Sequence, residues 1–130
     1  MSEMSNFLEN ALINATLRAT TYTSVATVYV SLWTSDPTDA GSGTEVSGNS
    51  YARTAVSFAT ASGTSGNVLN DADVTFPTAT GSWGTVGWIG INDAATSGNL
   101  LYHTALDTAK TIDSGDIFKI STGNLSVTLA

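Results

Sequence analysis

The first stretch of the chain places apolar side chains at three- and four-residue spacing, which is the period of an amphipathic helix. The repeating positions are Phe7, Leu8, Ala11, Leu12 and Ala15. Asn6 and Glu9 stand at the two ends of a capping box, with Asn6 as the N-cap residue. A helix of about 12 residues is marginal alone in water. We therefore expect residues 1–20 to contain a helix that docks either on its own domain or on a partner.

After Arg18 the apolar residues follow the two-residue period of strands, as in residues 27–33, where Val28, Val30 and Leu32 share one face. Further short strands are expected over residues 51–58, 74–76, 85–91, 100–105, 110–112, 117–120 and 125–129. Turn-forming residues separate them. This spacing predicts an all-β class, with residues 21–130 as an antiparallel β-sandwich. We expect a jelly roll, with an immunoglobulin-like sandwich as the alternative, and one domain overall including the N-terminal helix.

Three glycines recur every third residue in and beside the strand expected at 85–91. They are Gly84, Gly87 and Gly90. Their spacing fits neither the period of a strand nor a phosphate-binding loop. Glycine inside a strand marks a bulge or the close approach of another backbone, and we expect one of these here.

Charge is scarce, because only 12% of the residues are charged, and the formal net charge is −7. The basic residues are Arg18, Arg53, Lys110 and Lys119. Four basic side chains cannot form the patch that phosphate contacts require, so we expect no direct nucleic-acid binding. Anionic membrane surfaces are disfavoured for the same reason. The low-charge surface suits packing against many copies of other proteins.

Neither a secretion signal nor a membrane span is visible along the chain. The start of the sequence lacks a basic segment followed by an apolar run, and no apolar run approaches the length of a spanning helix. We therefore expect synthesis in the cytoplasm. Cysteine is absent, which excludes disulfides and thiolate metal sites.

Candidate catalytic residues are few. His103 is the only histidine, so every histidine-dependent triad would need it, and its position within residues 100–105 indicates a satisfied or exposed strand residue. Residues 63–66 come nearest to a nucleophile elbow, but they have the composition of a loop. We expect no catalytic site and no cofactor.

Two pairs of aspartates could offer carboxylates to a calcium ion or to glycoside hydrolysis. They are Asp36 with Asp39, and Asp71 with Asp73. The sixth position counted from Asp71 is Phe76, where a calcium loop of the EF-hand type needs glycine. Turn formation explains both pairs, and we expect no metal site.

The aromatic residues allow a binding alternative. Trp33, Trp83 and Trp88, together with four tyrosines, could stack on sugar rings as in a carbohydrate-binding module. Aromatic residues in a sandwich more often belong to the core or to an interface between subunits. We favour the core or interface interpretation.

Several segments, in order along the chain, resemble a family of small virion proteins of tailed bacteriophages, labelled tail-fibre-like or head-decoration proteins. The segments are residues 5–10, 30–41, 45–48, 51–53, 74–79, 83–86, 99–103 and 114–116. The resemblance covers essentially the whole chain. It implies a structural component of the virion without known enzymatic activity, and it brings no catalytic residue with it.

Two structural roles follow from this resemblance, and the first is a decoration or cement protein on the outer head shell. Such a subunit would bind the major capsid protein and assemble with itself as a homotrimer. We expect its partner contacts at Phe7, Leu8, Leu12 and Trp33, although the same four residues could belong to the core of the protomer.

The alternative role is a tail-fibre or tail-associated protein that attaches to a host surface, with a surface glycan as its ligand. This role predicts exposed aromatic and polar residues on loops 34–50 and 60–72. A glycan hydrolase is the remaining alternative, and only the aspartates support it. We expect a virion location, with the head surface preferred over the tail.

Overall fold

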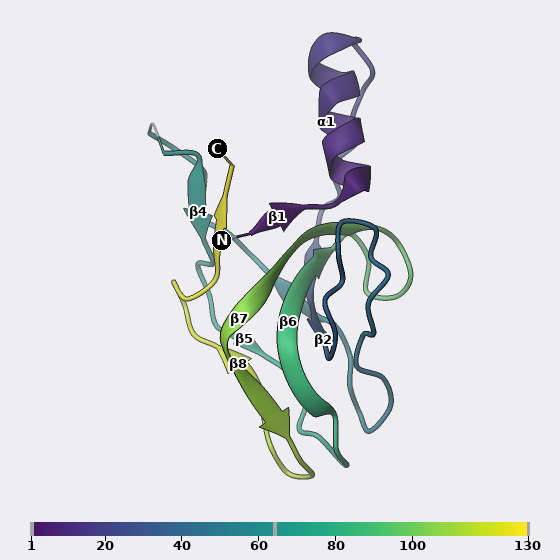
Figure 1. The fold of residues 1–130 in the computed structure, drawn as a ribbon. Coiled ribbons are helices and arrows are strands. Elements are labelled where there is room, and N and C mark those ends of the chain that lie inside the picture. The colour runs from purple at the N-terminus through teal and green to yellow at the C-terminus, as the bar shows by residue number, and fades with distance from the viewer. Residues whose placement is uncertain (1, 64, 130) are drawn as a thin grey trace.

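Antiparallel strands make up most of the regular secondary structure, and a helix stands near the N-terminus (Figure 1). The computed structural model describes residues 2–63 and 65–129. In chain order its elements are β1 (Glu3–Met4), α1 (Asn6–Leu17), β2 (Val28–Trp33), β3 (Thr54–Val56), β4 (Asn67–Leu69), β5 (Val74–Thr75), β6 (Gly84–Asn92), β7 (Leu100–Ile112), β8 (Lys119–Ile120) and β9 (Ser126–Thr128). The predicted all-β class with a short N-terminal helix is confirmed.

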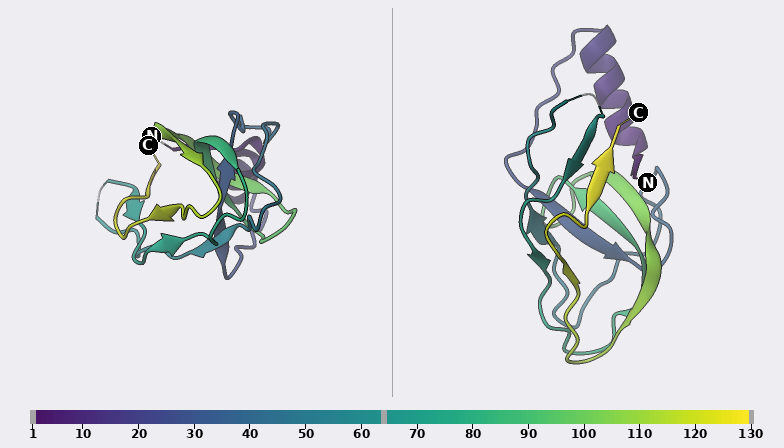
Figure 2. Two further views of the ribbon diagram at one scale, coloured as in Figure 1. Left: turned by 90° about the horizontal axis from the view of Figure 1, so that it is seen from below. Right: turned by 90° about the vertical axis from the view of Figure 1, so that its left-hand side faces the viewer.

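The largest sheet has five strands in the order β1-β7-β6-β2-β3, and each neighbouring pair is antiparallel. The remaining strands form two antiparallel pairs, β4 with β9 and β5 with β8. Seen from below in Figure 2, the five-stranded sheet and the two pairs curl around one core. A jelly roll consists of two larger sheets, so this finer part of the predicted fold is not confirmed.

Asn70 explains why the two small pairs are not one continuous ladder. Its side chain is 2% exposed and lies between β4 and β5. The amide nitrogen Nδ2 donates to the carbonyls of Ala72 and Ser121, and Oδ1 accepts from the N–H of Leu125. The side chain thus satisfies backbone groups that a regular ladder would have paired.

The strand boundaries differ from the sequence prediction in two regions. Residues 100–112 form one strand rather than two, because β6 pairs with β7 from Leu100 to Ile112 across a register shift. Within the loop expected at 60–72, residues 67–69 form β4, so that part of the loop prediction was wrong. The two residues of β1 carried no strand signal in the sequence.

One of the three glycines, Gly87, has a role that was expected of strand glycines, and Gly90 has a related one. The register between β6 and β7 shifts between Val86 and Trp88, which places a bulge at Gly87. A Cβ at Gly90 would lie 2.7 Å from Leu100 Cδ1 and 2.8 Å from Ser31 Oγ. The close approach at Gly90 therefore comes from neighbouring side chains rather than from another backbone.

The core lies between the five-stranded sheet and the two small pairs. Phe76 is 2% exposed, stacks on the ring of Tyr51 at 6.3 Å and meets Phe118 edge to face at 5.6 Å. Trp83 meets Tyr51 in a T-shaped contact at 5.5 Å. Such aromatic pairs add about 0.5–1.5 kcal/mol each beyond their buried area.

The helix α1 projects away from the sheets, and only its first turns lie near them (Figures 1 and 2). After the helix, residues 18–27 return to the sheet and lead into β2. No helix in residues 2–63 and 65–129 has the length and apolar character needed to cross a membrane.

Candidate functional site

The base of α1 is held by Ser5, which is 2% exposed. Ser5 is the N-cap: its backbone is extended, and its Oγ accepts from the N–H of Leu8 at 3.2 Å and donates to the carbonyl of Leu100. The Ser5 N–H also donates to the carbonyl of Leu101 at 2.9 Å. The predicted N-cap at Asn6 was therefore wrong by one residue, because Asn6 already belongs to the helix.

Opposite faces of α1 have different surroundings. Leu8 is 3% exposed and is the buried residue of the helix, while Leu12 on the same face is half-buried. Phe7, Ile13 and Leu17 lie on the outer face and are 42%, 53% and 79% exposed. The helix therefore leaves an apolar surface uncovered over its whole length.

The part of the outer face of α1 between Phe7 and Leu17 carries no charge, while Glu9 lies at the edge of the face, one turn before Ile13. Asn10 and Asn14 lie between its apolar residues, and Glu9 is the acidic residue of the first turn. Positions 7, 10, 14 and 17 alternate spacings of three and four residues, as in the seam of a coiled coil. Another helix that packs on this face would contact mainly apolar and amide side chains, with Glu9 at the edge of the contact.

The four predicted contact residues therefore lie in different environments. Leu8 packs against its own protein, in agreement with docking of the helix base on its own domain, and Phe7 lies at the surface. Trp33 is 5% exposed, and its Nε1 donates to Ser31 Oγ at 2.8 Å. Trp33 therefore offers a partner little surface, and a contact at Phe7, Leu8, Leu12 or Trp33 stays a prediction.

The tryptophans do not form an exposed platform for sugar rings. Trp83 is 4% exposed, and its Nε1 donates to the carbonyl of Asn49 at 3.0 Å. Trp88 is half-buried and is the cross-strand partner of Trp33. The core interpretation therefore holds for Trp33 and Trp83.

A hollow of about 300 Å³ opens beside the base of α1, between loop 34–50 and the turn after β6. Phe7, Asp39, Arg53 and Asn99 are among the residues that line it. Its lining is mainly polar.

Arg53, which lines this hollow, is the centre of a hydrogen-bond network. Its guanidinium makes a bidentate ion pair with Glu45, with Nε–Oε1 and Nη2–Oε2 distances of 2.8 Å, and the hydrogen bonds that it donates to Glu45 raise the pKa of Arg53. Its Nη1 donates to the carbonyls of Ala94 and Ser97. Tyr51 donates its hydroxyl to the same carboxylate at 2.8 Å, and burial raises the pKa of Tyr51 far above its usual range. The network joins loop 34–50 to the turn between β6 and β7.

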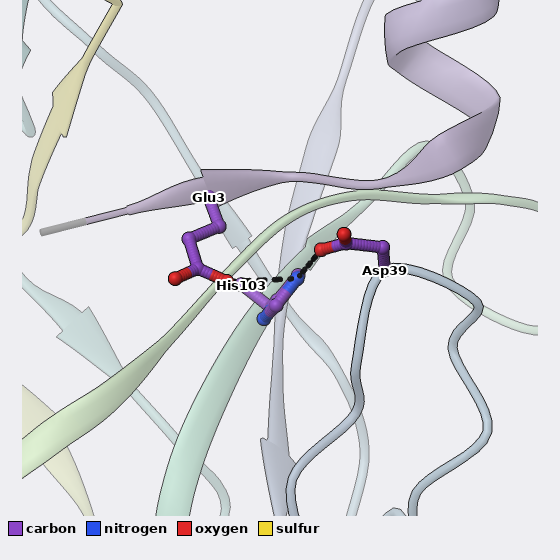
Figure 3. A group of neighbouring side chains, drawn as sticks. All are labelled: Glu3, Asp39 and His103. Atoms are coloured by element: carbon purple, nitrogen blue, oxygen red, sulfur yellow. Dashed lines mark hydrogen bonds and ion pairs between the residues drawn. The ribbon is translucent and has the colours of Figure 1, made fainter.

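A second polar cluster lies near the helix base, shares Asp39 with the lining of the hollow and joins three segments of the chain (Figure 3). The Nε2 of His103, on β7, lies 2.8 Å from Asp39 Oδ1 and 3.9 Å from Glu3 Oε2. His103 is 5% exposed, whereas the Glu3 and Asp39 side chains are 68% and 48% exposed. One atom from each residue can be chosen so that all three lie within 4.8 Å of one another.

The other aspartates considered in the sequence act separately. Asp36 Oδ1 accepts from the N–H of Thr38, as a turn former does. Asp71 accepts from the Ser57 hydroxyl. Asp73 accepts from Thr122 and pairs with Lys119 at 3.2 Å. Asp39 also lies in a turn, which the N–H of Gly41 closes by donating to the carbonyl of Thr38 at 3.1 Å, so the expected turn is present at both Asp36 and Asp39. The side chain of Asp39 has a further partner, His103.

The cluster of Glu3, Asp39 and His103 was missed by sequence reasoning. The three residues are far apart in the chain, and Asp39 was assigned to a turn with Asp36. His103 was interpreted correctly as a satisfied strand residue. The cluster could have been found only by knowing how β1 pairs with β7, because Glu3 and His103 are direct partners in that pairing.

By its fold the chain is an antiparallel β protein with a projecting N-terminal helix. A family model described as "Podophage GP4 fiber I protein gp80" matches residues 3–128. The chain therefore belongs to this family, and the predicted resemblance to structural proteins of tailed-phage virions is confirmed. A search of curated proteins finds no match.

The family description favours the second of the two structural roles considered from the sequence. It names a fibre, which fits the tail-fibre alternative better than the head-decoration role that was preferred from the sequence. The preference for the head surface has no support from this match. A low-charge surface does not distinguish a shell subunit from a fibre subunit, which is why composition led to the less supported choice.

Proposed function

We propose that this chain is a non-enzymatic structural subunit of a podophage fibre, located on the tail side of the virion. The match over residues 3–128 to a family described as a fibre protein carries this proposal. The residues that the sequence offered for glycan hydrolysis support the same view, because Asp71 and Asp73 are engaged with separate neighbours.

Within the fibre, the outer face of α1 is the surface through which we propose that copies of this chain associate. Phe7, Ile13 and Leu17 provide apolar contact area, and burying each of them contributes up to roughly 1.5–3 kcal/mol. Asn10 and Asn14 carry amides that both donate and accept, so identical faces are complementary to one another. A homotrimer is the assembly expected.

The location is tested by labelling phage particles that carry this chain with an antibody against it, followed by electron microscopy. Label on fibres of the tail supports the proposal. Label spread over the head shell would support the decoration role and overturn the fibre role. Release of sugar from host glycans, abolished by one acidic substitution, would overturn the non-enzymatic part.

Association through α1 is tested separately by sedimentation velocity of the full chain. Ile13→Asp and Leu17→Asp should convert the assembly to monomers, because a charge would be buried in the interface. Ile117→Asp is the matched control, since Ile117 is 55% exposed but lies on the β body. Equal effects of Ile13→Asp and Ile117→Asp, or an unchanged assembly in both helix variants, would contradict the role of α1.

A further inference from the structure

We propose that Glu3, Asp39 and His103 form a binding site for one divalent transition-metal ion, which fastens the base of α1 to the five-stranded sheet. The site goes beyond the proposed function and stands independently of it, because it rests only on side chains within the protomer. The ligand atoms converge, their backbone supports are fixed by hydrogen bonds, and the local charge is negative.

The ligand atoms converge from three directions on one point (Figure 3). His103 Nε2 faces Asp39 Oδ1 at 2.8 Å and Glu3 Oε2 at 3.9 Å. Zinc binds imidazole nitrogen and carboxylate oxygen at about 2.0–2.2 Å, so its ligand atoms lie roughly 3–4 Å apart. The observed spacing requires only small side-chain shifts, and the exposed Glu3 is free to make them.

The backbone around the three residues is already fixed. Glu3 and His103 are direct partners in the pairing of β1 with β7. The carbonyl of Asp39 accepts from the N–H of Asn6 at 2.9 Å, which ties loop 34–50 to the first turn of α1. A site whose supports are rigid loses little conformational entropy when it binds an ion.

The two carboxylates of Glu3 and Asp39 are neutralised better by a divalent ion than by the His103 ring alone. Of the four basic residues, Arg53 pairs with Glu45 and Lys119 with Asp73, and no ion pair of the described residues joins a lysine or arginine to Glu3 or Asp39. The ring presents one nitrogen, Nε2, to two carboxylates. A single N–H can serve only one of them well, whereas a divalent ion neutralises both.

The donor set also selects the class of metal. One imidazole nitrogen and two carboxylates leave a fourth position for water, which matches the three-ligand pattern of open zinc sites. Calcium prefers six to eight oxygen ligands, and magnesium keeps most of its waters. Since affinity for such a site rises from Mn²⁺ to Zn²⁺, we expect zinc to bind most tightly of the ions tested below.

The first experiment is isothermal titration calorimetry of the untagged full chain, treated with EDTA and dialysed, with ZnCl₂, MnCl₂, CaCl₂ and MgCl₂. We expect one Zn²⁺ per chain, weaker binding of Mn²⁺, and little binding of Ca²⁺ or Mg²⁺. Absence of Zn²⁺ binding would overturn the site and leave His103 as a structural partner of Asp39.

Substitutions separate this site from nonspecific binding to an acidic surface. Glu3→Gln and Asp39→Asn should each weaken Zn²⁺ binding about tenfold or more, because each removes one ligand charge while keeping the shape of the side chain. Asp73→Asn is the matched control, since Asp73 is equally exposed but pairs with Lys119. Unchanged affinity in Glu3→Gln and Asp39→Asn would overturn the proposal.

His103→Asn tests the nitrogen ligand, and circular dichroism shows whether this buried position still supports the fold. If this variant does not fold, ¹¹³Cd nuclear magnetic resonance of the wild-type chain tests the same ligand. Coupling between ¹¹³Cd and the His103 ring would identify His103 as a ligand directly. The same sample tests the fastening role: hydrogen exchange at the amides of Ser5 and Asn6 should slow when the ion binds. Unchanged exchange at these amides would contradict that role.

Discussion

The β body and the projecting helix are stabilised in different ways. The body closes on a continuous core in which Phe76 and Trp83 are almost fully buried. The helix buries Leu8, while Phe7 and Leu17 remain on the surface. The body is therefore packed by its own side chains, whereas the helix is held at its base and leaves its outer face uncovered.

The base of α1 compensates for the shortness of the helix. A helix of 12 residues gains little from its own hydrogen bonds, because nucleation is costly. Ser5 supplies the first turn with an acceptor, and Leu8 supplies the buried contact. Stability should therefore decrease along the helix from Ser5 toward Leu17.

The largest expected difference between the two regions comes from truncating one phenylalanine in each. Phe76→Ala removes ring contacts with Tyr51 and Phe118 and leaves a cavity, so it should lower the free energy of unfolding by about 3–5 kcal/mol. Phe7→Ala should change it by less than about 1 kcal/mol in the monomer. Urea unfolding followed by tryptophan fluorescence measures both, and similar losses would mean that α1 belongs to the same cooperative core.

A smaller and more local effect is expected from Ser5→Ala. Loss of an N-cap hydroxyl costs about 1–2 kcal/mol, and here it also leaves the carbonyl of Leu100 without its donor. Hydrogen exchange should accelerate in α1 while β6 and β7 stay protected. Ser5→Thr, which keeps the hydroxyl, should restore protection. Thr16→Ala is the control within the helix, because Thr16 only bonds back to the carbonyls of Leu12 and Ile13.

The smallest effect concerns acid stability at the surface of the body. Hydrogen bonds from the N–H and hydroxyl of Thr122, and then the contact with Lys119, hold the pKa of Asp73 below its ordinary value of 3.8. A lowered pKa in the folded state stabilises the fold above pH 3.8, and this contribution is lost as the pH falls through the folded pKa.

Asp73→Asn should therefore lower the melting temperature slightly at neutral pH, and the difference from wild type should vanish in strong acid. Differential scanning calorimetry across pH measures it. Thr122→Val, which removes only the hydroxyl donor, should show a smaller difference of the same sign. A constant difference at all pH values would mean that Asp73 does not contribute through its charge.

Local patterns in the sequence were sufficient to predict the class of fold. Alternation over residues 28–33 predicted β2, and the glycine spacing predicted irregularity in β6. The arrangement of the sheets could not be predicted, because it depends on long-range contacts. The three hydrogen bonds of Asn70 divide one ladder into two pairs, and no local pattern indicates them.

The candidate sites could not be predicted from local sequence patterns either. The apolar period predicted α1 but not that Phe7 and Leu8 would face opposite environments, since burial depends on where the helix projects. Asp39 and His103 meet only after loop 34–50 folds back toward β7. Such a cluster follows from the tertiary fold, so residue types along the chain could not reveal it.

The exposed face of α1 has a consequence for how this protein can diverge. Ile13 and Leu17 make no contribution to the core, so mutations there leave the folding of the body intact. If copies associate through α1 as proposed, selection can change the neighbour that the helix binds while the β body is inherited unchanged. A lineage of phages could in this way reuse one body in differently built fibres, with the innovation confined to a few turns of helix.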